Sequence, residues 1–510
     1  MNGNFCWRRW SAVLLALVLA ACDGGGNGAP PGDVTPPAIV STLPVDGASG
    51  VTQTTAVAAT FSEAVAPASI TASTFSLSAG ALPVSGSLTV SGPVVTFTPS
   101  APLALATQFT ARLAVGVTDL AGNALTAPFT WNFTTEVTPW PGTRQLGTPA
   151  DDTGNAVAVD GAGNVYVAGS TSGDLDGVGV GDPLFGGTDL FLAKFGPSGN
   201  LLFTRQLGTE PTDEARGVAV DGAGNVYVAG STSGDLDGVG IGDPLFGGVD
   251  LFLAKFDPSG NLLFTRQLGT VPNDEARGVA VDGAGNVYVA GNTSGDLDGV
   301  GGGDPLFGGG DLFLAKFGPS GNLLFTRQLG TPADDTGNAV AVDGAGNVFV
   351  AGSTSGDLDG VGGGDPLFGG GDFFLAKFDP AGNLLFTRQL GTVPADEARG
   401  VAVDGAGNVY VVGSTAGDLD GVGVDDPLVG GTDFFLAKFD PAGNLLFTRQ
   451  LGTVPADSAF GVAVARLAVG GNVFVTGETL GDLDGPDVGA PPFGGTDLFL
   501  DKFDPFGNLQ

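Results

Sequence analysis

One unit recurs along most of this chain. The peptide Arg-Gln-Leu-Gly-Thr returns every 61 residues, at Arg144, Arg205, Arg266, Arg327, Arg388 and Arg449. Each unit holds four runs of β-forming residues, which in the first unit are residues 156–159, 164–169, 190–195 and 201–207. Repeats of this length with several strands each are typical of propeller arrays, in which every unit is a sheet that needs its neighbours to bury its faces. We therefore predict an all-β propeller of six detectable four-stranded units over residues 143–510.

The four runs differ in a way that orders them from the centre of such a ring outward. The first run is small (AVAV or GVAV), which suits the crowded inner end. The second and third runs are apolar on both faces, so neighbouring sheets must cover them on both sides. The fourth run mixes Arg205 and Gln206 with Leu201 and Phe203, as expected of a half-exposed outer strand.

Two side chains recur inside these strands. We interpret the lysine of each third run as a structural or edge residue rather than a catalytic one. The tyrosine of the second run is replaced by Phe349 and Phe474 in two copies, so we interpret it as a core residue whose hydroxyl is dispensable there. The lysines are Lys194, Lys255, Lys316, Lys377, Lys438 and Lys502, and the tyrosines are Tyr166, Tyr227, Tyr288 and Tyr410.

The unit resembles the SBBP propeller repeat of bacterial surface proteins. The resemblance is carried by GVAVDGAGNVYVAG at 217–230, DLFLAKF at 250–256 and PSGNLL at 258–263, and it covers residues 143–510. The family name implies seven blades, whereas six copies are present. The last copy stops before its fourth strand, and residues 143–147 carry an unpaired fourth-strand sequence. We therefore predict that residues 143–147 complete the sixth blade and close the ring.

Residues 38–136 predict a second all-β domain. Seven Thr/Val/Phe-rich runs separated by Gly, Pro or Asp-Gly indicate a sandwich of about seven strands. Trp131 and Phe133 alternate into its core, while Asp119 and Asn123 flank a turn. The segment resembles the bacterial Ig-like domain of S-layer and other surface proteins, and this resemblance implies a spacer or adhesive module. The matching peptides are TPP at 35–37, DGASGV at 46–51, FSEAV at 61–65, TFTP at 96–99, DLAGN at 119–123 and WNFTT at 131–135.

The N-terminus has the features of an export signal. Arg8 and Arg9 precede a short apolar run, and the stretch ends Leu19-Ala20-Ala21-Cys22. This resembles the bacterial lipoprotein signal, which implies removal of residues 1–21 and lipid attachment at Cys22. The mature chain would then hold one lipidated cysteine and no disulfide. Residues 22–37 are rich in Gly and Pro and are expected to be a tether. We predict a cell-envelope location, at the outer membrane or cell surface rather than the inner membrane.

Composition excludes several classes of function. The formal net charge is -35, which argues against nucleic-acid binding and against membrane contact other than through the lipid anchor. Histidine is absent, so neither a Ser-His-Asp triad nor His-ligated zinc is available.

The acidic residues gather in particular loops. Strand alternation puts the connections from fourth to first strands and from second to third strands on one face, which we expect to be acidic. The second-to-third loops carry Asp-Leu-Asp-Gly and usually a third Asp, a pattern that offers hard oxygen ligands for calcium or forms a solvated turn. The candidates are Asp174, Asp176, Asp182, Asp235, Asp237, Asp243, Asp296, Asp298, Asp304, Asp357, Asp359, Asp365, Asp418, Asp420, Asp426, Asp482 and Asp484.

Repetition also bears on function. An enzyme site usually assembles different residues in different roles, whereas here each candidate group recurs about six times, and no catalytic residue is singled out. We predict an exported, lipid-anchored, non-catalytic binding, adhesion or scaffold protein, with a surface protein or a polysaccharide as its partner. The alternatives are a passive surface spacer and a propeller enzyme that acts on polysaccharide.

Overall fold

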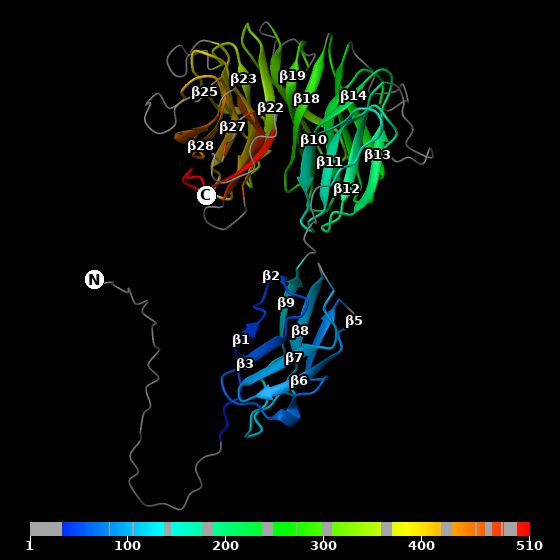
Figure 1. Cartoon of the computed structure of the whole chain (residues 1–510), viewed down its shortest axis with the longest axis vertical. Coiled ribbons are helices and arrows are strands. Elements are labelled where there is room, and N and C mark those ends of the chain that lie inside the picture. The colour runs from blue at the N-terminus through cyan, green and yellow to red at the C-terminus, as the bar shows by residue number, and fades with distance from the viewer. Residues whose placement is uncertain are drawn as a thin grey trace, which may run out of the picture. The chain divides into compact units, whose positions relative to one another are not determined.

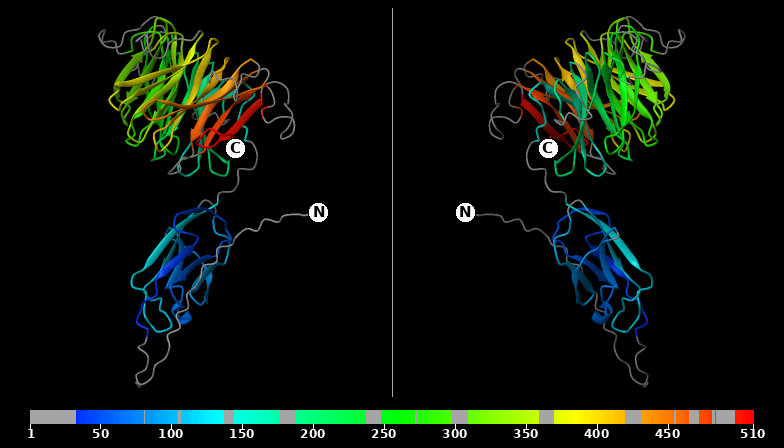
Figure 2. Two further views of the ribbon diagram at one scale, coloured as in Figure 1. Left: turned by 90° about the vertical axis from the view of Figure 1, so that its left-hand side faces the viewer. Right: turned by 90° about the vertical axis from the view of Figure 1, so that its right-hand side faces the viewer.

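The computed structural model describes part of the chain (Figures 1 and 2). The residues that it describes are 33–80, 82–104, 107–136, 144–175, 187–236, 248–271, 273–297, 309–358, 370–419, 431–453, 456–464, 472–480, 483 and 497–510. The predicted signal, Cys22 and most of the tether lie outside these residues. No helix within the described ranges is long and apolar enough to cross a membrane. The chain divides into two compact units, Met1–Thr138 and Pro139–Gln510.

The first unit is a sandwich of two sheets (Figure 1). One sheet has the order β1-β3-β7-β6 and the other the order β2-β9-β8-β4-β5. The strands are β1 (Ile39–Leu43), β2 (Ala48–Val51), β3 (Val57–Phe61), β4 (Phe75–Ala79), β5 (Leu82–Pro83), β6 (Gly86–Ser91), β7 (Val94–Pro99), β8 (Gln108–Leu113) and β9 (Phe129–Thr135), with a short 3-10 turn, η1 (Pro67–Ser69). All seven predicted strands are present, and β2 and β5 are additional.

The sandwich core contains the residues that alternation predicted. Trp131 and Phe133 are buried, and Phe75 packs 5.9 Å from the ring of Trp131. The predicted turn is also present: Asn123 donates from its backbone N to Asp119 Oδ1 at 2.8 Å and from Nδ2 to Oδ2 at 2.7 Å. Asp119 is thus a structural turn residue, although it is almost fully buried.

The second unit is a series of antiparallel sheets, which we call blades one to six (Figure 1). Blades one to five have four strands each, in the order of the chain, and blade six has three. The strands are β10 (Asp152–Val159), β11 (Val165–Thr171), β12 (Asp189–Phe195), β13 (Leu201–Leu207), β14 (Asp213–Val220), β15 (Val226–Thr232), β16 (Asp250–Phe256), β17 (Leu262–Leu268), β18 (Asp274–Val281), β19 (Val287–Thr293), β20 (Asp311–Phe317), β21 (Leu323–Leu329), β22 (Asp335–Val342), β23 (Val348–Thr354), β24 (Asp372–Phe378), β25 (Leu384–Leu390), β26 (Asp396–Val403), β27 (Val409–Thr415), β28 (Asp433–Phe439), β29 (Leu445–Leu451), β30 (Asp457–Val464), β31 (Val473–Thr479) and β32 (Asp497–Phe503). The fold is therefore all-β, an Ig-like sandwich and a propeller, as predicted.

Consecutive blades pack face to face, which explains why their middle strands are apolar on both sides. Leu190 and Leu192 of blade one lie in one core cluster with Val226 and Phe252 of blade two. The recurring lysine joins the same interface, since Lys194 Nζ donates to Pro258 O of the next blade at 2.9 Å and lies 4.9 Å from the centre of the Tyr166 ring. The lysines of blades one to five are structural in this way, and the four tyrosines are fully buried core residues.

The predicted closure of the ring by residues 143–147 is wrong for the described residues. Residues 144–148 form no strand, and the sheet of blade six is β30-β31-β32. Arg144 instead donates from Nε to Gly199 O of blade one at 2.9 Å, as the fourth-strand arginine of each blade does to the blade that follows. On β32, Leu498 and Leu500 are 83% and 68% exposed, whereas the matching Leu251 and Leu253 of blade two are fully buried. Among the described residues, no fourth strand pairs with β32 and no following blade covers it, which explains this exposure.

Candidate functional site

A cavity of about 870 Å³ lies along the innermost strands of the propeller unit. All six innermost strands, β10, β14, β18, β22, β26 and β30, contribute to its wall. We call this cavity the channel. The small residues of the first strands, such as Ala156 and Gly217, are part of the wall, as expected of the inner end of each blade.

A β-bulge in every innermost strand marks one residue of the channel wall. The pairing register shifts between Ala215 and Gly217 in blade two, so Arg216 has no partner on β15. A bulge inserts an extra residue and changes the direction of its side chain. The bulged residues are Asn155, Arg216, Arg277, Asn338, Arg399 and Phe460, and all six line the channel.

A glycine on the second strand makes room for each bulge. A Cβ on Gly230 would lie 1.9 Å from the carbonyl oxygen of Glu214, a distance that no side chain tolerates. The matching Gly169 has the same relation to Thr153 O, at 1.8 Å. The glycine of the repeated Val-Ala-Gly sequence is therefore required by the geometry that presents the channel residues.

Charged channel residues form ion pairs within and between blades. Arg216 pairs with Glu214 of its own strand at 2.9 Å and with Glu275 of the next blade at 3.2 Å. Glu275 also pairs with Arg277 at 3.3 Å. In blade five, Arg399 pairs with Glu397 at 2.9 Å. These side chains are about one third exposed, so the pairs remain accessible from the channel.

Blades one and four carry an asparagine where blades two, three and five carry an arginine. Asn155 Nδ2 donates to Glu214 Oε1 at 3.2 Å, and Asn338 Nδ2 donates to Glu397 Oε1 at 3.1 Å. In blade six the position is Phe460, and the Arg399 guanidinium lies 4.9 Å from the centre of its ring. Each of these contacts joins one blade to the next and leaves the channel with unlike groups around its wall.

The electrostatic environment of Arg277 differs from that of an exposed arginine. Burial lowers the pKa of Arg277, the Arg216 charge lowers it further, and the charge of Glu275 opposes both effects. Its Nε donates to Asn292 Oδ1 at 3.0 Å. Arg277 is thus held in place by its own blade rather than by the following one.

Sequence reasoning missed these channel residues. Among blades one to five, charge within the strands changes from copy to copy at only two positions, Thr or Glu at the site of Glu214 and Asn or Arg at the site of Arg216. Comparing the copies column by column would have found both. The argument that every candidate group recurs about six times overlooked this variation.

The predicted calcium ligands are only partly within the described residues. Asp174, Asp235, Asp296, Asp357 and Asp418 are described, whereas Asp176, Asp182, Asp237, Asp243, Asp298, Asp304, Asp359, Asp365, Asp420, Asp426, Asp482 and Asp484 lie outside them. Around the first Asp, the loop backbone is held by an outer-strand glutamine: Leu175 N donates to Gln206 Oε1 at 2.6 Å, and Gln206 Nε2 donates to Gly173 O at 2.9 Å. Calcium binding and its alternative, a solvated turn, both stay predictions.

In blades two to five, the aspartates that begin the first and third strands are buried, although they stand next to the loops that we expected to form the acidic face. Asp213, at the start of β14, accepts hydrogen bonds from the backbone N and Oγ1 of Thr209. Burial raises the pKa of Asp213 despite these hydrogen bonds. Asp189, which begins β12, is also fully buried. These acids hold the ends of the strands together and add no charge to the surface.

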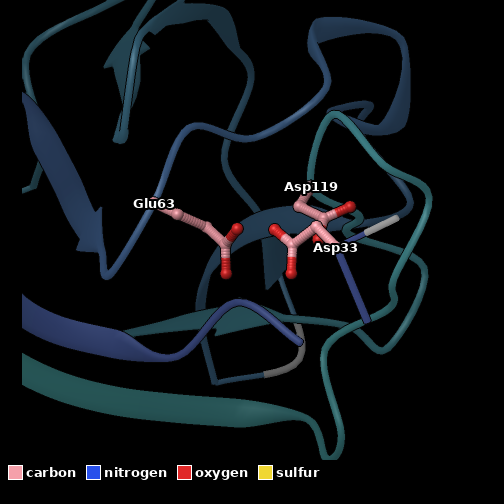
Figure 3. Close-up of side chains that lie close together, drawn as sticks. All are labelled: Asp33, Glu63 and Asp119. Atoms are coloured by element: carbon pink, nitrogen blue, oxygen red, sulfur yellow. The ribbon is translucent and has the colours of Figure 1, made fainter. Parts of the chain in front are cut away.

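One further carboxylate group lies in the Ig-like unit (Figure 3). One oxygen from each of Asp33, Glu63 and Asp119 falls within 4.8 Å of the others. Desolvation raises the pKa of Glu63, and a hydrogen bond with Asp33 and the charges of both aspartates raise it further.

The comparisons with known proteins agree with both units. Residues 33–135 match the family model of the bacterial Ig-like domain. Five segments match the family model of the beta-propeller repeat: 142–176, 202–237, 263–298, 324–359 and 385–420. The chain therefore contains a bacterial Ig-like domain and beta-propeller repeats, which confirms both resemblances.

Similar proteins cover the chain to different extents. "Regulatory protein FlaEY" of Caulobacter vibrioides is 30% identical over 361 residues, which are 64% of this chain. This chain spans only 36% of the length of that relative. Among solved structures, a Quinonprotein alcohol dehydrogenase-like protein from Bacteroides thetaiotaomicron is 10% identical over 93% of this chain and 95% of its own, with a TM-score of 0.35. A gluconolactonase from Xanthomonas campestris is 14% identical over 66% and 96%, with a TM-score of 0.31.

Proposed function

We propose that this chain, which joins a bacterial Ig-like domain to beta-propeller repeats, is a non-catalytic binding protein of the bacterial cell envelope. The observation that carries the proposal is the channel wall. Five blades are near copies of one another, yet their strands differ in charge only where the residues lie at or next to the channel. Unlike groups around a cavity provide the specificity that identical blades alone would lack.

The channel chemistry favours binding over catalysis. Glu214, Glu275 and Glu397 each pair with an arginine at 3.3 Å or less. Each of these carboxylates is therefore engaged in a charge-assisted ion pair within the protein. A non-catalytic role also fits the relative that is named a regulatory protein.

Attachment to the envelope is the second part of the proposal. The sequence Leu19-Ala20-Ala21-Cys22 supports lipid attachment at Cys22, and the following Gly/Pro-rich residues would separate the folded units from the membrane. The Ig-like domain then serves as a spacer. In the producing cell, Cys22→Ser should move the protein from the membrane fraction to the soluble fraction and abolish incorporation of labelled palmitate. Retention of the variant in the membrane fraction would refute the anchor.

Binding is tested by exchanging natural sequences between blades. Three of the four residues that distinguish β26 from β10 are exchanged in the full chain, through Glu397→Thr, Ala398→Gly and Arg399→Asn. Blades one and four already fold with these residues, so the exchange alters the channel without foreign side chains. We expect binding to isolated envelope polysaccharide or surface-protein fractions to fall at least tenfold.

A second exchange between copies serves as the control. Asp257→Gly places the residue of blade one in a hairpin turn of blade two, away from the channel, and should leave binding unchanged. If binding is unaffected by the blade-five exchange, the channel is not the binding site. Absence of binding to every fraction would favour the passive spacer, and turnover of a polysaccharide would favour the enzyme.

A further inference from the structure

We infer that the channel binds a neutral saccharide, an inference that rests on the proposed binding function and specifies its ligand. Three properties of the wall lead to this class of ligand: balanced charge, donors and acceptors side by side, and an accessible aromatic ring. Each property excludes other ligands on its own, and together they leave an uncharged polyhydroxyl compound.

The charges of the wall are balanced. The wall holds three arginines and two glutamates, and a third glutamate outside the lining, Glu275, pairs with two of these arginines. Every arginine lies within 3.3 Å of a glutamate oxygen. A strongly anionic ligand would have to displace Glu275 from Arg216 and Arg277. A cationic ligand would have to displace the arginines from the glutamates. Breaking a partly buried ion pair leaves the other charge unpaired, so neither an anionic nor a cationic ligand gains binding free energy from entering the channel.

Donors and acceptors alternate around the wall. Arg216 and Asn155 both reach Glu214, which puts N–H donors and carboxylate acceptors in one cluster. Asn338, Glu397 and Arg399 repeat the arrangement on the other side of the propeller. A hydroxyl group donates and accepts at once, so it satisfies such a wall without disturbing the ion pairs. A purely apolar ligand would remove the water that hydrogen-bonds to these donors and acceptors and would offer no replacement, so it is excluded.

Phe460 supplies the apolar surface that a sugar ring needs. Its side chain is 42% exposed and lies in the channel wall, with Arg399 on its face. Below the polar residues, Val218, Val279 and Val401 continue the wall. A saccharide has both polar edges and apolar C–H faces, and the volume of the channel is within the range of about 300–1,000 Å³ that is usual for ligand sites.

The test measures binding of defined oligosaccharides to the full chain by titration calorimetry. The probes are maltohexaose, cellohexaose and chitohexaose as neutral compounds, and hexagalacturonate as an anionic compound of similar size. We expect at least one neutral probe to bind, with an affinity that stays within about twofold between about 0.05 M and about 0.5 M salt, because screening weakens only charged contacts. Hexagalacturonate should not bind.

Two phenylalanine variants locate the site. Phe460→Ala should weaken binding of the neutral probe at least tenfold. Phe506→Ala, a matched change at a side chain that is 75% exposed and outside the channel, should leave it unchanged. Circular dichroism confirms that both variants are folded.

The remaining outcomes separate this inference from the proposed function. Binding of hexagalacturonate, or of an envelope protein, that is lost in the blade-five exchange would overturn the saccharide and keep the channel. Neutral-probe binding that survives both Phe460→Ala and the exchange would overturn the channel site. If none of the probes binds, the saccharide inference is wrong.

Discussion

The lysine between consecutive blades offers a direct test of how the propeller is held together. Lys255 is only 9% exposed, and its Nζ donates to Pro319 O of blade three at 2.9 Å. The same ammonium lies 5.0 Å from the centre of the Tyr227 ring and 5.9 Å from that of Phe264. Lys255→Met keeps the length of the side chain and removes both the charge and the donor.

The expected loss follows from these contacts. Hydrogen bonds to charged groups contribute about 1.5–3 kcal/mol, and the carbonyl of Pro319 would lose its charged donor. The contact with the ring of Tyr227 adds about 0.5–2 kcal/mol. Because methionine avoids the desolvation of a buried ammonium, part of this lost stability is recovered. We expect Lys255→Met to lower the free energy of unfolding by about 2 kcal/mol.

Urea unfolding followed by near-UV circular dichroism measures this loss. All four tyrosines of the chain belong to the propeller unit, so the tyrosine signal reports on this unit. Lys502→Met is the matched control. No hydrogen bond from Lys502 Nζ to a following blade occurs among the described residues, so this change should cost under about 0.5 kcal/mol. Equal effects at Lys255 and Lys502, or no effect at Lys255, would refute the assigned role of the lysine.

Three further predictions concern single positions. Burial raises the pKa of Asp501, which stands where other blades have alanine, so the folded protein loses stability as pH rises from the ordinary pKa of Asp through the raised one. Asp501→Ala should therefore raise the unfolding midpoint at pH 7 and change it little near pH 3. A gain of equal size at both pH values would contradict this. Gly230→Ala should cost more than about 3 kcal/mol in urea unfolding because its Cβ would meet Glu214 O, whereas Gly222→Ala, which has open space, should cost under about 1 kcal/mol. Since Gln206 already holds the backbone beside Asp174, a thermal melt with calcium and with chelator should show no shift; a saturable rise that magnesium does not reproduce would make these loops ion sites.

The strands of the propeller were predictable because their patterns repeat and their turns are explicit. The first strands extend further than the sequence suggests, however. β10 begins at Asp152, four residues before the small apolar run, because Asp-Thr-Gly-Asn resembles a loop and hides a bulge at Asn155. Once an extra residue is inserted, alternation no longer tells which side chain faces the channel. The pattern of a single strand therefore did not predict which residues line the channel.

Other features depend on contacts between distant residues. β2 was missed because Ala-Ser-Gly-Val has a turn-like composition, and it forms a strand only through parallel pairing with β9. The burial of Asp213 was not predicted, because an Asp next to a loop is usually exposed. Its burial depends on Thr209 and Thr232, one before and one after it in the chain. The sequence did indicate both domain types, since their turn and core residues lie in short peptides.

The contacts between blades have a consequence for how such a protein changes over generations. Lys255 donates to Pro319, and Lys316 donates in the same way to Pro380, so the two sides of each interface match those of every other. Removal or duplication of one 61-residue unit would rejoin surfaces that already fit, without a compensating mutation. The same event would change the number and order of the arginines and asparagines around the channel. Recombination between the repeats in the gene could thus alter what the channel recognises while the fold is preserved.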